Sequence, residues 1–346
     1  MLKVLFICGG ISGEHEISLI STKYVLQALD RKLFEPQVLV IERSGRMSLV
    51  DEKHLEQLPD NPRNLKSLQG EAVLFKPYSE GKGGAGFLCQ EKFYSPDVVF
   101  SLLHGVGGED GSIQGFFETA QIPMVGSGVK SSAVCMDKAF TKKLCLQSGL
   151  PVVPFQEIHQ EIDVSELRFK YPFFVKPTEE GSSLGVSKVK SQEDLAEALH
   201  MAARFGEKLL VEPTIEGREL EVAVLDEGES RVISPAGEIL CKTEFYSYEA
   251  KYVDPDAAEL HLPAAISQSE HAEIQELASR VFDCLECRGL ARIDFFQNKE
   301  GEFVLNEVNT MPGFTPISMY PKLLGLAGVS YTNLISRLIA SALPKS

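Results

Sequence analysis

The sequence predicts a mixed fold, α/β at its N-terminal end and α+β over the remainder. Strand-like and helix-like segments alternate over residues 1–128, and this order is the one from which parallel sheets are built. Later strands come in local pairs with helices to one side, which is typical of α+β folds. The chain has 346 residues, too many for one typical hydrophobic core, so we expect two or three domains.

The N-terminal elements follow a regular order. The segments "LKVLFI", "QVLVIE" and "DVVFSLLHG" are expected to be strands, and "GGISGEHEIS" is a glycine-rich turn that leads into a helix. Ligands of parallel sheets bind at the carboxyl ends of the strands, where this turn and the loop "GVGGEDG" fall. Residues 45–95 hold little pattern, and we interpret them as a peripheral excursion.

The character of the sequence changes around Gly126–Lys130. The stretch "SSAVCMDKAFTKKLCLQSG" predicts one helix, which Gly149 and Pro151 end. "FFVKPTEEGSSLGVSKV" predicts two strands joined by a loop of small residues, and "KLLVEPTIEGRELEVAVL" predicts a further strand pair. The predicted domains are 1–128, 129–211 and 212–346.

Composition limits the possible partners. Apolar residues make up 44 % and charged residues 24 % of the chain, as in an ordinary soluble enzyme. The net charge of −15 argues against nucleic acid or an anionic membrane as the main partner. No run of about 18 apolar residues exists, and the start of the chain reads as a strand rather than a signal peptide. The seven scattered cysteines fit a reducing compartment, so we expect a cytoplasmic protein.

Two spacings resemble metal motifs without completing them. Cys284 and Cys287 form C-x-x-C, but no second pair or histidine stands at zinc spacing. The residues before them follow helical spacing, which favours a structural helix. His15-Glu16 begins an H-E-x-x-H pattern, but Leu19 occupies the position of the second histidine.

The segments "GLARIDFF" and "LNEVNTMPGFT" are separated by "QNKEG", which predicts a hairpin. If residues 298–301 form the loop, Asp294 opposes Leu305 and Arg292 opposes Glu307. Residues i and i+2 of a strand share a face. One face of the hairpin is therefore expected to carry Arg292, Asp294, Glu307 and Asn309.

Two carboxylates and an amide oxygen on one face suit Mg²⁺, which prefers hard oxygen ligands and shares substrate phosphates. A solvated polar face on an edge hairpin explains the same residues equally well when the hairpin is considered alone.

The segment "VKPTEEGSSLGVSK" offers backbone N–H groups and hydroxyls to phosphate oxygens. It is not a P-loop, and flexible hairpins commonly have this composition. Lys176 directly follows the apolar "FFV", so it needs an anionic or polar partner. Lys138 in "MDK" is a second candidate phosphate cation.

Glu212 ends one apolar strand and Glu219 begins another, so the two could hold an adenine edge and a ribose. Ordinary acids on a surface hairpin are the alternative. In "EFYSYEAKYVD", aromatic residues crowd beside Lys251 without a clean period, which predicts a loop. Such a loop is either a structural plug or a lid that excludes water.

Together these features resemble the ATP-grasp superfamily and, within it, the D-alanine–D-alanine ligases, over almost the whole chain. The segments that carry the resemblance occur in order: "GGISGEHEISL", "HGVGGEDGSIQG", "GSGVKSSAVCMDK", "KPTEEGSSLGVSKV", "YEAKY", "RIDFF" and "NEVNTMPGFTPISMYP". The main difference from the shorter family members is the long excursion at 45–95, which overlaps none of these segments.

The resemblance implies an ATP-grasp fold behind an N-terminal parallel-sheet domain. It implies ATP-dependent joining of two D-alanines through an acyl phosphate, for peptidoglycan precursor synthesis. We also expect a homodimer. The implied metal ligands, for two Mg²⁺ ions with Mn²⁺ as an alternative, are Asp294, Glu307 and Asn309. The implied ATP-binding residues are Lys138, Lys176, Ser182, Ser183, Glu212, Ile215, Glu219 and Lys251.

On the substrate side, the resemblance implies that Glu14 holds the ammonium of the first D-alanine, with His104 nearby. Ser182 and Tyr252 join Glu14 in a hydrogen-bonded group that connects the lid to the site. The remaining implied residues are Arg292 and Gly313 at the tetrahedral oxyanion, and Ser318 and Met319 at the second D-alanine.

Two other functions remain open at this point. Another ATP-grasp ligase would make D-Ala–D-lactate or D-Ala–D-Ser; Tyr252 in "YEAKY" argues against ester formation. A nucleotide-binding regulator without catalysis would be favoured if metal or phosphate residues were missing, and none is missing.

Overall fold

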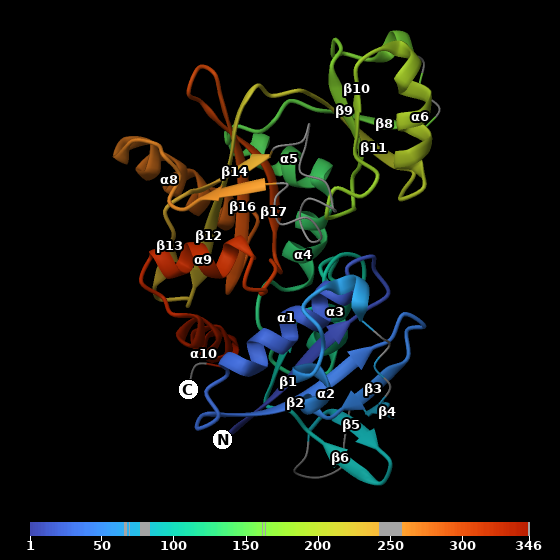
Figure 1. Ribbon diagram of the computed structural model, residues 1–346, viewed down its shortest axis with the longest axis vertical. Coiled ribbons are helices and arrows are strands. Elements are labelled where there is room, and N and C mark those ends of the chain that lie inside the picture. The colour runs from blue at the N-terminus through green and yellow to red at the C-terminus, as the bar shows by residue number, and fades with distance from the viewer. Residues whose placement is uncertain are drawn as a thin grey trace.

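The computed structural model describes residues 1–65, 68, 70–76, 84–160, 162, 164–241 and 258–344. Within these ranges the chain forms three β-sheets, one after another along the sequence. Figure 1 shows the first sheet at the bottom, the third on the left and the small second sheet at the upper right.

The first sheet has seven strands in the order β6-β5-β4-β3-β2-β1-β7. The strands β1 (Leu2–Gly9), β2 (Phe34–Ile41) and β7 (Val98–Ser101) are parallel, which confirms the predicted parallel sheet. Helix α1 (His15–Ala28) follows the glycine-rich turn after β1, and α3 (Ser112–Thr119) follows the loop after β7.

Residues 45–95 lie at one edge of the first sheet, but they contain more regular structure than their sequence pattern indicated. They contribute antiparallel strands that widen the first sheet, together with the short helices α2 (Glu52–Glu56) and η1 (Pro62–Asn64). These strands are short, and their apolar and polar residues do not alternate cleanly in the sequence. They are β3 (Met47–Val50), β4 (Glu71–Lys76), β5 (Gly86–Cys89) and β6 (Lys92–Tyr94).

The second sheet is small, with the strand order β10-β9-β11-β8. Helix α6 (Gln192–Ala203) packs on it, and Ser191 and Asp194 form a capping box at its start. The other elements are β8 (Gln156–His159), η2 (Val164–Glu166), β9 (Phe173–Pro177), β10 (Ser187–Val189) and β11 (Lys208–Pro213).

The third sheet has the order β15-β14-β12-β16-β17, with β13 paired to β12. Its strands are β12 (Gly217–Asp226), β13 (Arg231–Ile233), β14 (Gly237–Cys241), β15 (Ala258–His261), β16 (Leu290–Asn298) and β17 (Phe303–Asn309). The predicted pairing of β11 with β12 is wrong, because each strand belongs to a different sheet. The short connector between them, residues 214–216, crosses from one sheet to the other.

The long helix predicted before Gly149 is two helices, α4 (Val129–Met136) and α5 (Lys138–Gln147). They are separated by Asp137, whose backbone is extended and whose carboxylate caps α5 by accepting from the N–H groups of Ala139 and Phe140. An aspartate that caps a helix can therefore mark the end of one helix and the start of the next inside a continuous helical pattern.

The predicted register of the β16–β17 hairpin is also wrong. Asp294 opposes Glu307 and Arg292 opposes Asn309, and the register shifts between Asp294 and Phe295. A β-bulge inserts one residue into one strand, here Asn306, since Phe295 pairs with Leu305. The four polar residues nevertheless share one face, because cross-strand partners point the same way.

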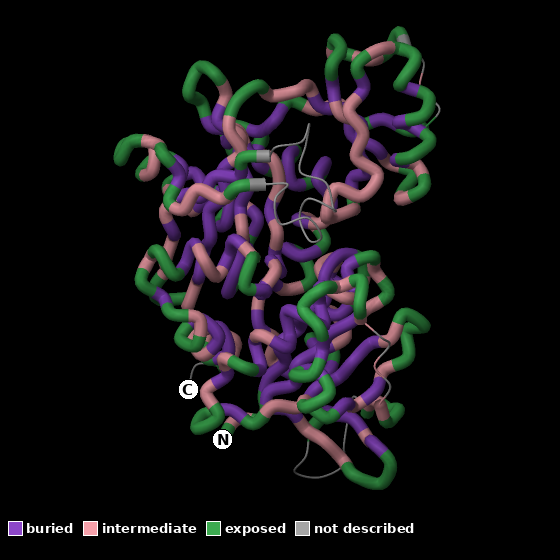
Figure 2. The backbone as a smooth tube through the Cα atoms, viewed as in Figure 1, coloured by how far each residue is buried: buried purple, intermediate pink, exposed green. Residues whose placement is uncertain are grey.

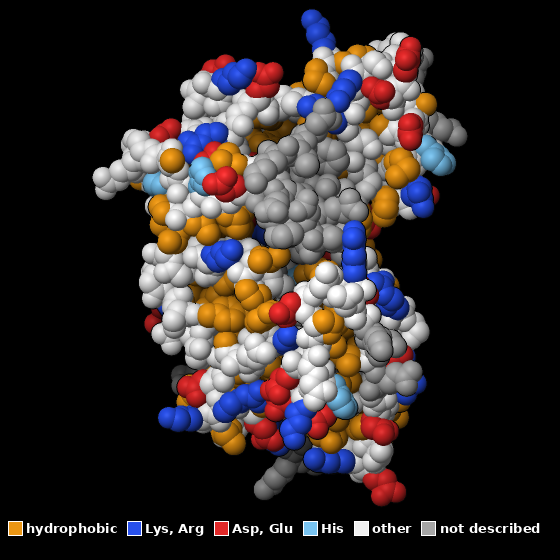
Figure 3. All heavy atoms as spheres, viewed as in Figure 1, with side chains coloured by type: hydrophobic (Ala, Val, Ile, Leu, Met, Phe, Trp, Pro, Cys, Tyr) orange, Lys and Arg blue, Asp and Glu red, His pale blue; other side chains and the backbone are white. Residues whose placement is uncertain are grey.

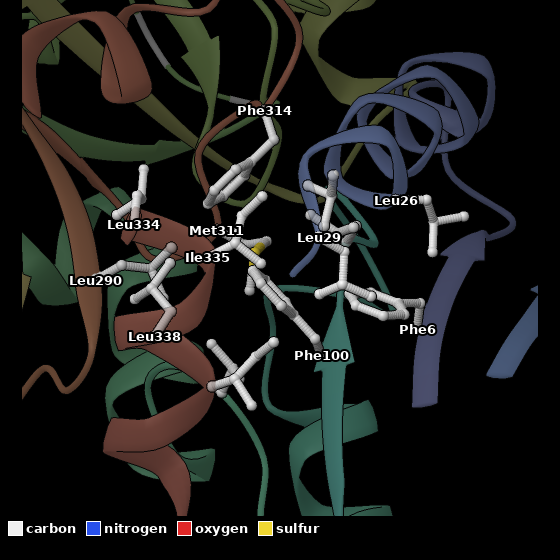
Figure 4. Packing of buried hydrophobic residues seen from close by; sticks show 14 of the residues in the cluster. Phe6, Leu26, Leu29, Phe100, Leu290, Met311, Phe314, Leu334, Ile335 and Leu338 are labelled. Atoms are coloured by element: carbon white, nitrogen blue, oxygen red, sulfur yellow. The ribbon is translucent and has the colours of Figure 1, made fainter. Parts of the chain in front are cut away.

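A hydrophobic cluster joins the first and third sheets. Phe6 and Phe100 extend from β1 and β7 toward Phe314 and the helix α10 (Tyr331–Ala342), as Figure 4 shows. Phe100 and Phe314 meet edge to face with ring centroids 5.7 Å apart. Figure 2 shows that buried residues are concentrated in the strands of both sheets. The chain segments that carry site residues are therefore held by one continuous core.

The remaining helices of the third sheet are α8 (Gln268–Cys284) and α9 (Met319–Leu326). Helix α8 confirms the structural helix predicted before the C-x-x-C pair, and Cys287 lies beyond its end. All six cysteines whose side chains are described are free. No single helix in the described ranges has the length and apolarity of a membrane span; α9 and α10 pass that test only together, across a bend of 101°.

Candidate active site

Two adjoining cavities lie where the three sheets meet. The larger, of about 440 Å³, lies between the second and third sheets. The smaller, of about 90 Å³, lies between the first and third sheets. Gly181, Ser182 and Glu307 line both cavities, so a ligand in one would abut a ligand in the other.

The larger cavity gathers the residues that the sequence assigned to ATP, as far as they are described. They come from α5, β9 and the β9–β10 turn, β11, the connector after it and the start of β12. The assigned residues that line it are Lys138, Lys176, Ser182, Ser183, Glu212, Ile215 and Glu219. Lys251 lies outside the described residues.

A network of ion pairs lines and backs this cavity. Lys176 Nζ lies 2.7 Å from Glu212 Oε2, and Lys142 Nζ donates to Glu212 Oε1. Burial alone would raise the pKa of Glu212, but the charges of Lys142 and Lys176 outweigh it and lower the pKa. Lys138 Nζ lies 3.4 Å from Glu307 Oε2. The cavity thus presents two lysines beside carboxylate groups, and either lysine could instead pair with a polyanion.

The β9–β10 turn has an unusual backbone. Ser182 and Ser183 both adopt left-handed conformations, with φ of 52° and 60°. A left-handed backbone is rare for residues other than glycine, and residues that adopt it cluster at functional sites. The Ser182 hydroxyl donates to Glu14 Oε1, so this turn is tied across the small cavity to the N-terminal sheet.

The smaller cavity gathers the residues that the sequence assigned to the two D-alanines and the oxyanion. They are Glu14, His104, Ser182, Arg292, Gly313, Ser318 and Met319, and the implied metal ligands Glu307 and Asn309 also line it. Tyr252 lies outside the described residues. Asp294 is buried behind this wall and forms an ion pair with Arg292.

His104 and Glu109 both contact the backbone of Met311. His104 Nδ1 lies 3.0 Å from the Met311 carbonyl oxygen, and the Met311 N–H donates to Glu109 Oε1 at 3.2 Å. Burial lowers the pKa of His104, so the ring is neutral and Nδ1 carries the proton. His104 Nε2 is buried and has no hydrogen-bond partner among the described residues, and His104 lines the small cavity.

A side chain at position 313 would displace the Ser318 hydroxyl. An added Cβ would lie 2.6 Å from Ser318 Oγ, well inside contact distance. Ser318 begins α9, and its hydroxyl accepts from the Thr315 N–H at 3.0 Å. The N-terminus of α9 therefore faces the cavity with a hydroxyl and backbone donors, which favour a carboxylate.

The hairpin face fits a divalent cation by its donor chemistry. Asp294 and Glu307 are cross-strand neighbours, and Asn309 Nδ2 lies 3.1 Å from Asp294 Oδ2. No group of three or more His, Cys, Asp or Glu side chains among the described residues is placed to hold a metal. The set is instead two carboxylates and an amide, and Mg²⁺ commonly completes such a set with water and phosphate oxygens.

Sequence reasoning missed several residues of the site. Glu109 lines the small cavity and lies within the quoted segment "HGVGGEDGSIQG". Glu221 Oε2 lies 3.1 Å from Arg292 Nε. Lys142 could have been found by its spacing, because it lies one helical turn after Lys138. Asn306 could not, because its position depends on the bulge.

Comparison with protein families and solved structures extends these observations. Residues 3–127 match the family model described as D-ala D-ala ligase N-terminus, and residues 144–340 match D-ala D-ala ligase C-terminus. The D-alanine--D-alanine ligase of Caldicellulosiruptor bescii is 44% identical over 356 residues, covering 100% of this chain and 96% of the relative. D-alanine--D-alanine ligase A of Escherichia coli is 40% identical, covering 99% of this chain and 96% of that one.

Solved structures agree with this similarity. The D-alanine-D-alanine ligase from Coxiella burnetii superposes with a TM-score of 0.83 at 34% identity, covering 99% of this chain and 95% of that one. The VanG D-Ala:D-Ser ligase from Enterococcus faecalis superposes with a TM-score of 0.85 at 33% identity, covering 99% of both chains. Similarity of fold alone therefore does not distinguish D-alanine from D-serine as the second substrate.

Proposed function

The chain belongs to the D-alanine–D-alanine ligase family, and from this we propose how its two cavities perform that family's reaction. The protein is an ATP-dependent ligase of the ATP-grasp fold that joins two D-alanines, a step of peptidoglycan synthesis. The observation that carries the proposal is the junction of the cavities at Gly181, Ser182 and Glu307. ATP in the larger cavity would place its terminal phosphate beside amino acids in the smaller one.

The reaction needs ATP because a free carboxylate is a poor electrophile. The carboxylate of the first D-alanine attacks the terminal phosphorus, which gives an acyl phosphate and ADP. The amine of the second D-alanine then attacks the carbonyl carbon, phosphate leaves, and the amine loses a proton. Phosphoryl transfer depends mainly on positioning and on charge neutralisation, so the charged groups of the junction decide the rate.

On the nucleotide side, Lys138 and Lys176 neutralise phosphate charge, together with the backbone and hydroxyls of Ser182 and Ser183. Their position at the cavity wall and the short turn between β9 and β10 support these roles. Glu212 and Ile215 take the base and Glu219 the ribose, since all three line the end of the cavity at the crossing from β11 to β12. We assign Lys251 to the phosphates on the family resemblance.

On the amino-acid side, Glu14 binds the ammonium of the first D-alanine, because it is an acid at the wall of the small cavity. His104 faces the same substrate through Nε2. Ser182 positions Glu14, and Tyr252 is assigned to the same group by resemblance. Ser318 and Met319 at the start of α9 bind the second D-alanine through its carboxylate.

Arg292 and the Gly313 N–H stabilise the oxyanion that forms when the second amine attacks. Both residues line the small cavity. Removing one oxyanion donor from other enzymes costs about 3–4 kcal/mol of transition-state stabilisation. The Arg292 guanidinium is already held by Asp294, with Nε 2.8 Å from Oδ1, so it needs little reorganisation.

Asp294, Glu307 and Asn309 would hold divalent metal, which we propose to be two Mg²⁺ ions, with Mn²⁺ as a substitute. Bound metal neutralises the negative charge of the phosphates during transfer. Lys138 Nζ lies 3.4 Å from Glu307 Oε2, so the lysine would neutralise phosphate charge beside this site.

We further propose a cytoplasmic homodimer with domains 1–128, 129–211 and 212–346. The free cysteines support a reducing compartment. Charges of both signs are interspersed over the coloured part of the face in Figure 3 rather than gathered into a basic stripe, which gives nucleic acid no evident track on that face. Helices α4 and α5 pack against β17, so residues 129–147 brace the third sheet.

The test is a phosphate-release assay with ATP, Mg²⁺ and a panel of D-amino acids, with the products identified by mass spectrometry. We expect D-alanine alone to give D-alanyl-D-alanine and one phosphate per dipeptide. A D-Ala–D-Ser product formed in preference to the dialanine would instead favour the specificity named for the Enterococcus faecalis structure. Phosphate release without any dipeptide would exclude ligation.

A further inference from the structure

A buried lysine behind the large cavity has no role in the proposed function. Lys142 lies on α5, one helical turn after Lys138, so the two side chains extend from the same helix face. The Lys142 side chain is 0 % exposed, and it is not among the described residues that line the cavity. Any effect of Lys142 on a ligand must therefore act through a neighbour.

That neighbour is Glu212, whose side chain is held between two lysines. Lys142 Nζ donates to Oε1, and Lys176 Nζ lies 2.7 Å from Oε2. Each carboxylate oxygen thus faces one ammonium group. Glu212 and Lys176 line the cavity and can touch a ligand, whereas Lys142 cannot.

The two lysines differ in their freedom. Lys176 extends from β9 into the cavity, where its Nζ also lies 3.4 Å from Asn306 Oδ1. When Lys176 turns to a phosphate, its contact with Glu212 weakens. Lys142 is enclosed and stays, so Glu212 keeps a counter-charge. Without one, a carboxylate buried this deeply would take up a proton or move.

We propose that Lys142 is a positioning residue for base recognition, which keeps Glu212 ionised and oriented to accept the amino group of adenine. This rests on the proposed function, because it takes the large cavity as the ATP site. An ionised carboxylate only accepts hydrogen bonds. It therefore favours adenine, which carries an amino group at position 6, over hypoxanthine, which carries a carbonyl there.

The charges around Lys142 agree with this role. Burial lowers the pKa of Lys142 to about 8. The negative charges of Glu212 and Glu307 raise this pKa, and the positive charge of Lys176 lowers it further. The nearby Cys145 thiol has its pKa raised by burial to about 12 and stays neutral. Lys142 is therefore largely charged at neutral pH, and Glu212 is its direct partner.

The test measures the binding of ATP, inosine triphosphate and inorganic tripolyphosphate to the full-length protein, each with Mg²⁺, by calorimetry. In Lys142→Met we expect the affinity for ATP to fall by roughly tenfold or more. Affinities for the other two ligands should change by about twofold or less. The selectivity for ATP over inosine triphosphate is therefore lost while phosphate binding persists.

Lys143→Met is the matched control. Lys143 is the next residue on α5, is 48% exposed and pairs with Glu157 on the surface, so its loss should change none of the three affinities. Equal losses for all three ligands in Lys142→Met would show that Lys142 serves the phosphates or the fold as a whole. An unchanged affinity for ATP would show that it does not hold Glu212. Either result overturns the proposal.

A second comparison keeps the question answerable if Lys142→Met does not fold. Because Lys142 acts through Glu212, adding Lys142→Met to Glu212→Gln should leave the ratio of ATP to inosine triphosphate affinity unchanged. A further fall in that ratio would contradict the proposal. If the unaltered protein itself does not prefer ATP over inosine triphosphate, the assignment of Glu212 to the base fails first, independently of Lys142.

Discussion

The Ser182 hydroxyl donates a hydrogen bond to the Glu14 carboxylate, although the two residues are far apart in the sequence. Glu14 precedes α1 in the N-terminal sheet region, and Ser182 lies in the β9–β10 turn that lines the large cavity. Ser182 also lines the small cavity. One contact thus connects the nucleotide side of the site to the amino-acid side.

Loss of this contact should affect the amino acid more than the nucleotide. We expect Ser182→Ala to lower kcat/KM for D-alanine by roughly 10- to 100-fold, because the donor to a buried carboxylate is removed. Ser183→Ala is the matched comparison, since Ser183 has the same left-handed backbone but lines only the large cavity. It should raise the KM for ATP instead. Steady-state kinetics with each substrate varied will separate the two, and identical profiles would contradict the assignment.

The metal site can be tested at Glu307. Glu307→Gln should lower the rate of phosphate release by about 100-fold or more, because one anionic ligand at the phosphates is lost. The fold should persist, since the side chain lies at the cavity wall rather than in the core. Glu300→Gln, in the exposed turn of the same hairpin, is the control. Near-normal activity of Glu307→Gln in Mg²⁺ would exclude this hairpin as the metal site.

Glu109 should make stability depend on pH. Burial, and then the charge of Glu14, raise its pKa from 4.5 to about 8. A raised pKa means that the folded protein binds the proton more tightly, so this contribution is complete below pH 4.5 and is lost as the pH rises through about 8. Glu109→Gln mimics the neutral form at every pH.

Urea unfolding of Glu109→Gln and of the unaltered protein should therefore diverge with pH. The free energy of unfolding of the variant, relative to the unaltered protein, should rise between about pH 5 and about pH 9. Glu118→Gln on the exposed side of α3 provides the control. A difference that stays constant over this range would show that Glu109 is ionised throughout.

The core that joins the first and third sheets predicts a stability effect. Phe314 is 0 % exposed and contacts the rings of Phe100 and Tyr320. Phe314→Ala should lower the free energy of unfolding by about 3–5 kcal/mol. Phe140→Ala, which removes a ring that is 52% exposed, should have little effect. A cost below about 1 kcal/mol for Phe314→Ala would mean that this packing contributes little.

The product should be a D,D-dipeptide amide rather than an ester. A free α-amino group has a pKa of about 8 or above, so phosphate release with D-alanine alone should rise from about pH 6 to about pH 9 as the neutral amine increases. Added D-lactate should give no appreciable depsipeptide near pH 6. A dominant D-Ala–D-lactate peak in the mass spectrum at that pH would overturn the amide assignment.

Much of the site followed from local patterns. The alternation of side chains along the hairpin placed Arg292, Asp294, Glu307 and Asn309 on one face even though the predicted register was wrong. The error was tolerated because the observed register differs by two residues at Asp294, and a shift of two preserves the face. The order of the motifs along the chain indicated the family, because each motif is a short local stretch of sequence.

Contacts between distant segments could not be obtained in this way. The bulge at Asn306, the crossing from β11 to β12 and the short strands within 45–95 depend on which strands become neighbours. Lys142 and Lys143 are adjacent lysines in the sequence, yet Lys142 is enclosed beside Glu212 and Lys143 faces solvent. Only packing distinguishes them.

The sequence by itself therefore determined the parallel strands of the first sheet, which face of the hairpin is polar and to which family the chain belongs. These depend on backbone periodicity and on residue types at fixed local spacing. The tertiary structure alone decided that Glu14 meets Ser182, that Glu109 and His104 hold Met311, and that Lys142 backs Glu212. Burial and pairing of charges are properties of the three-dimensional surroundings, and residues brought together from different sheets create them.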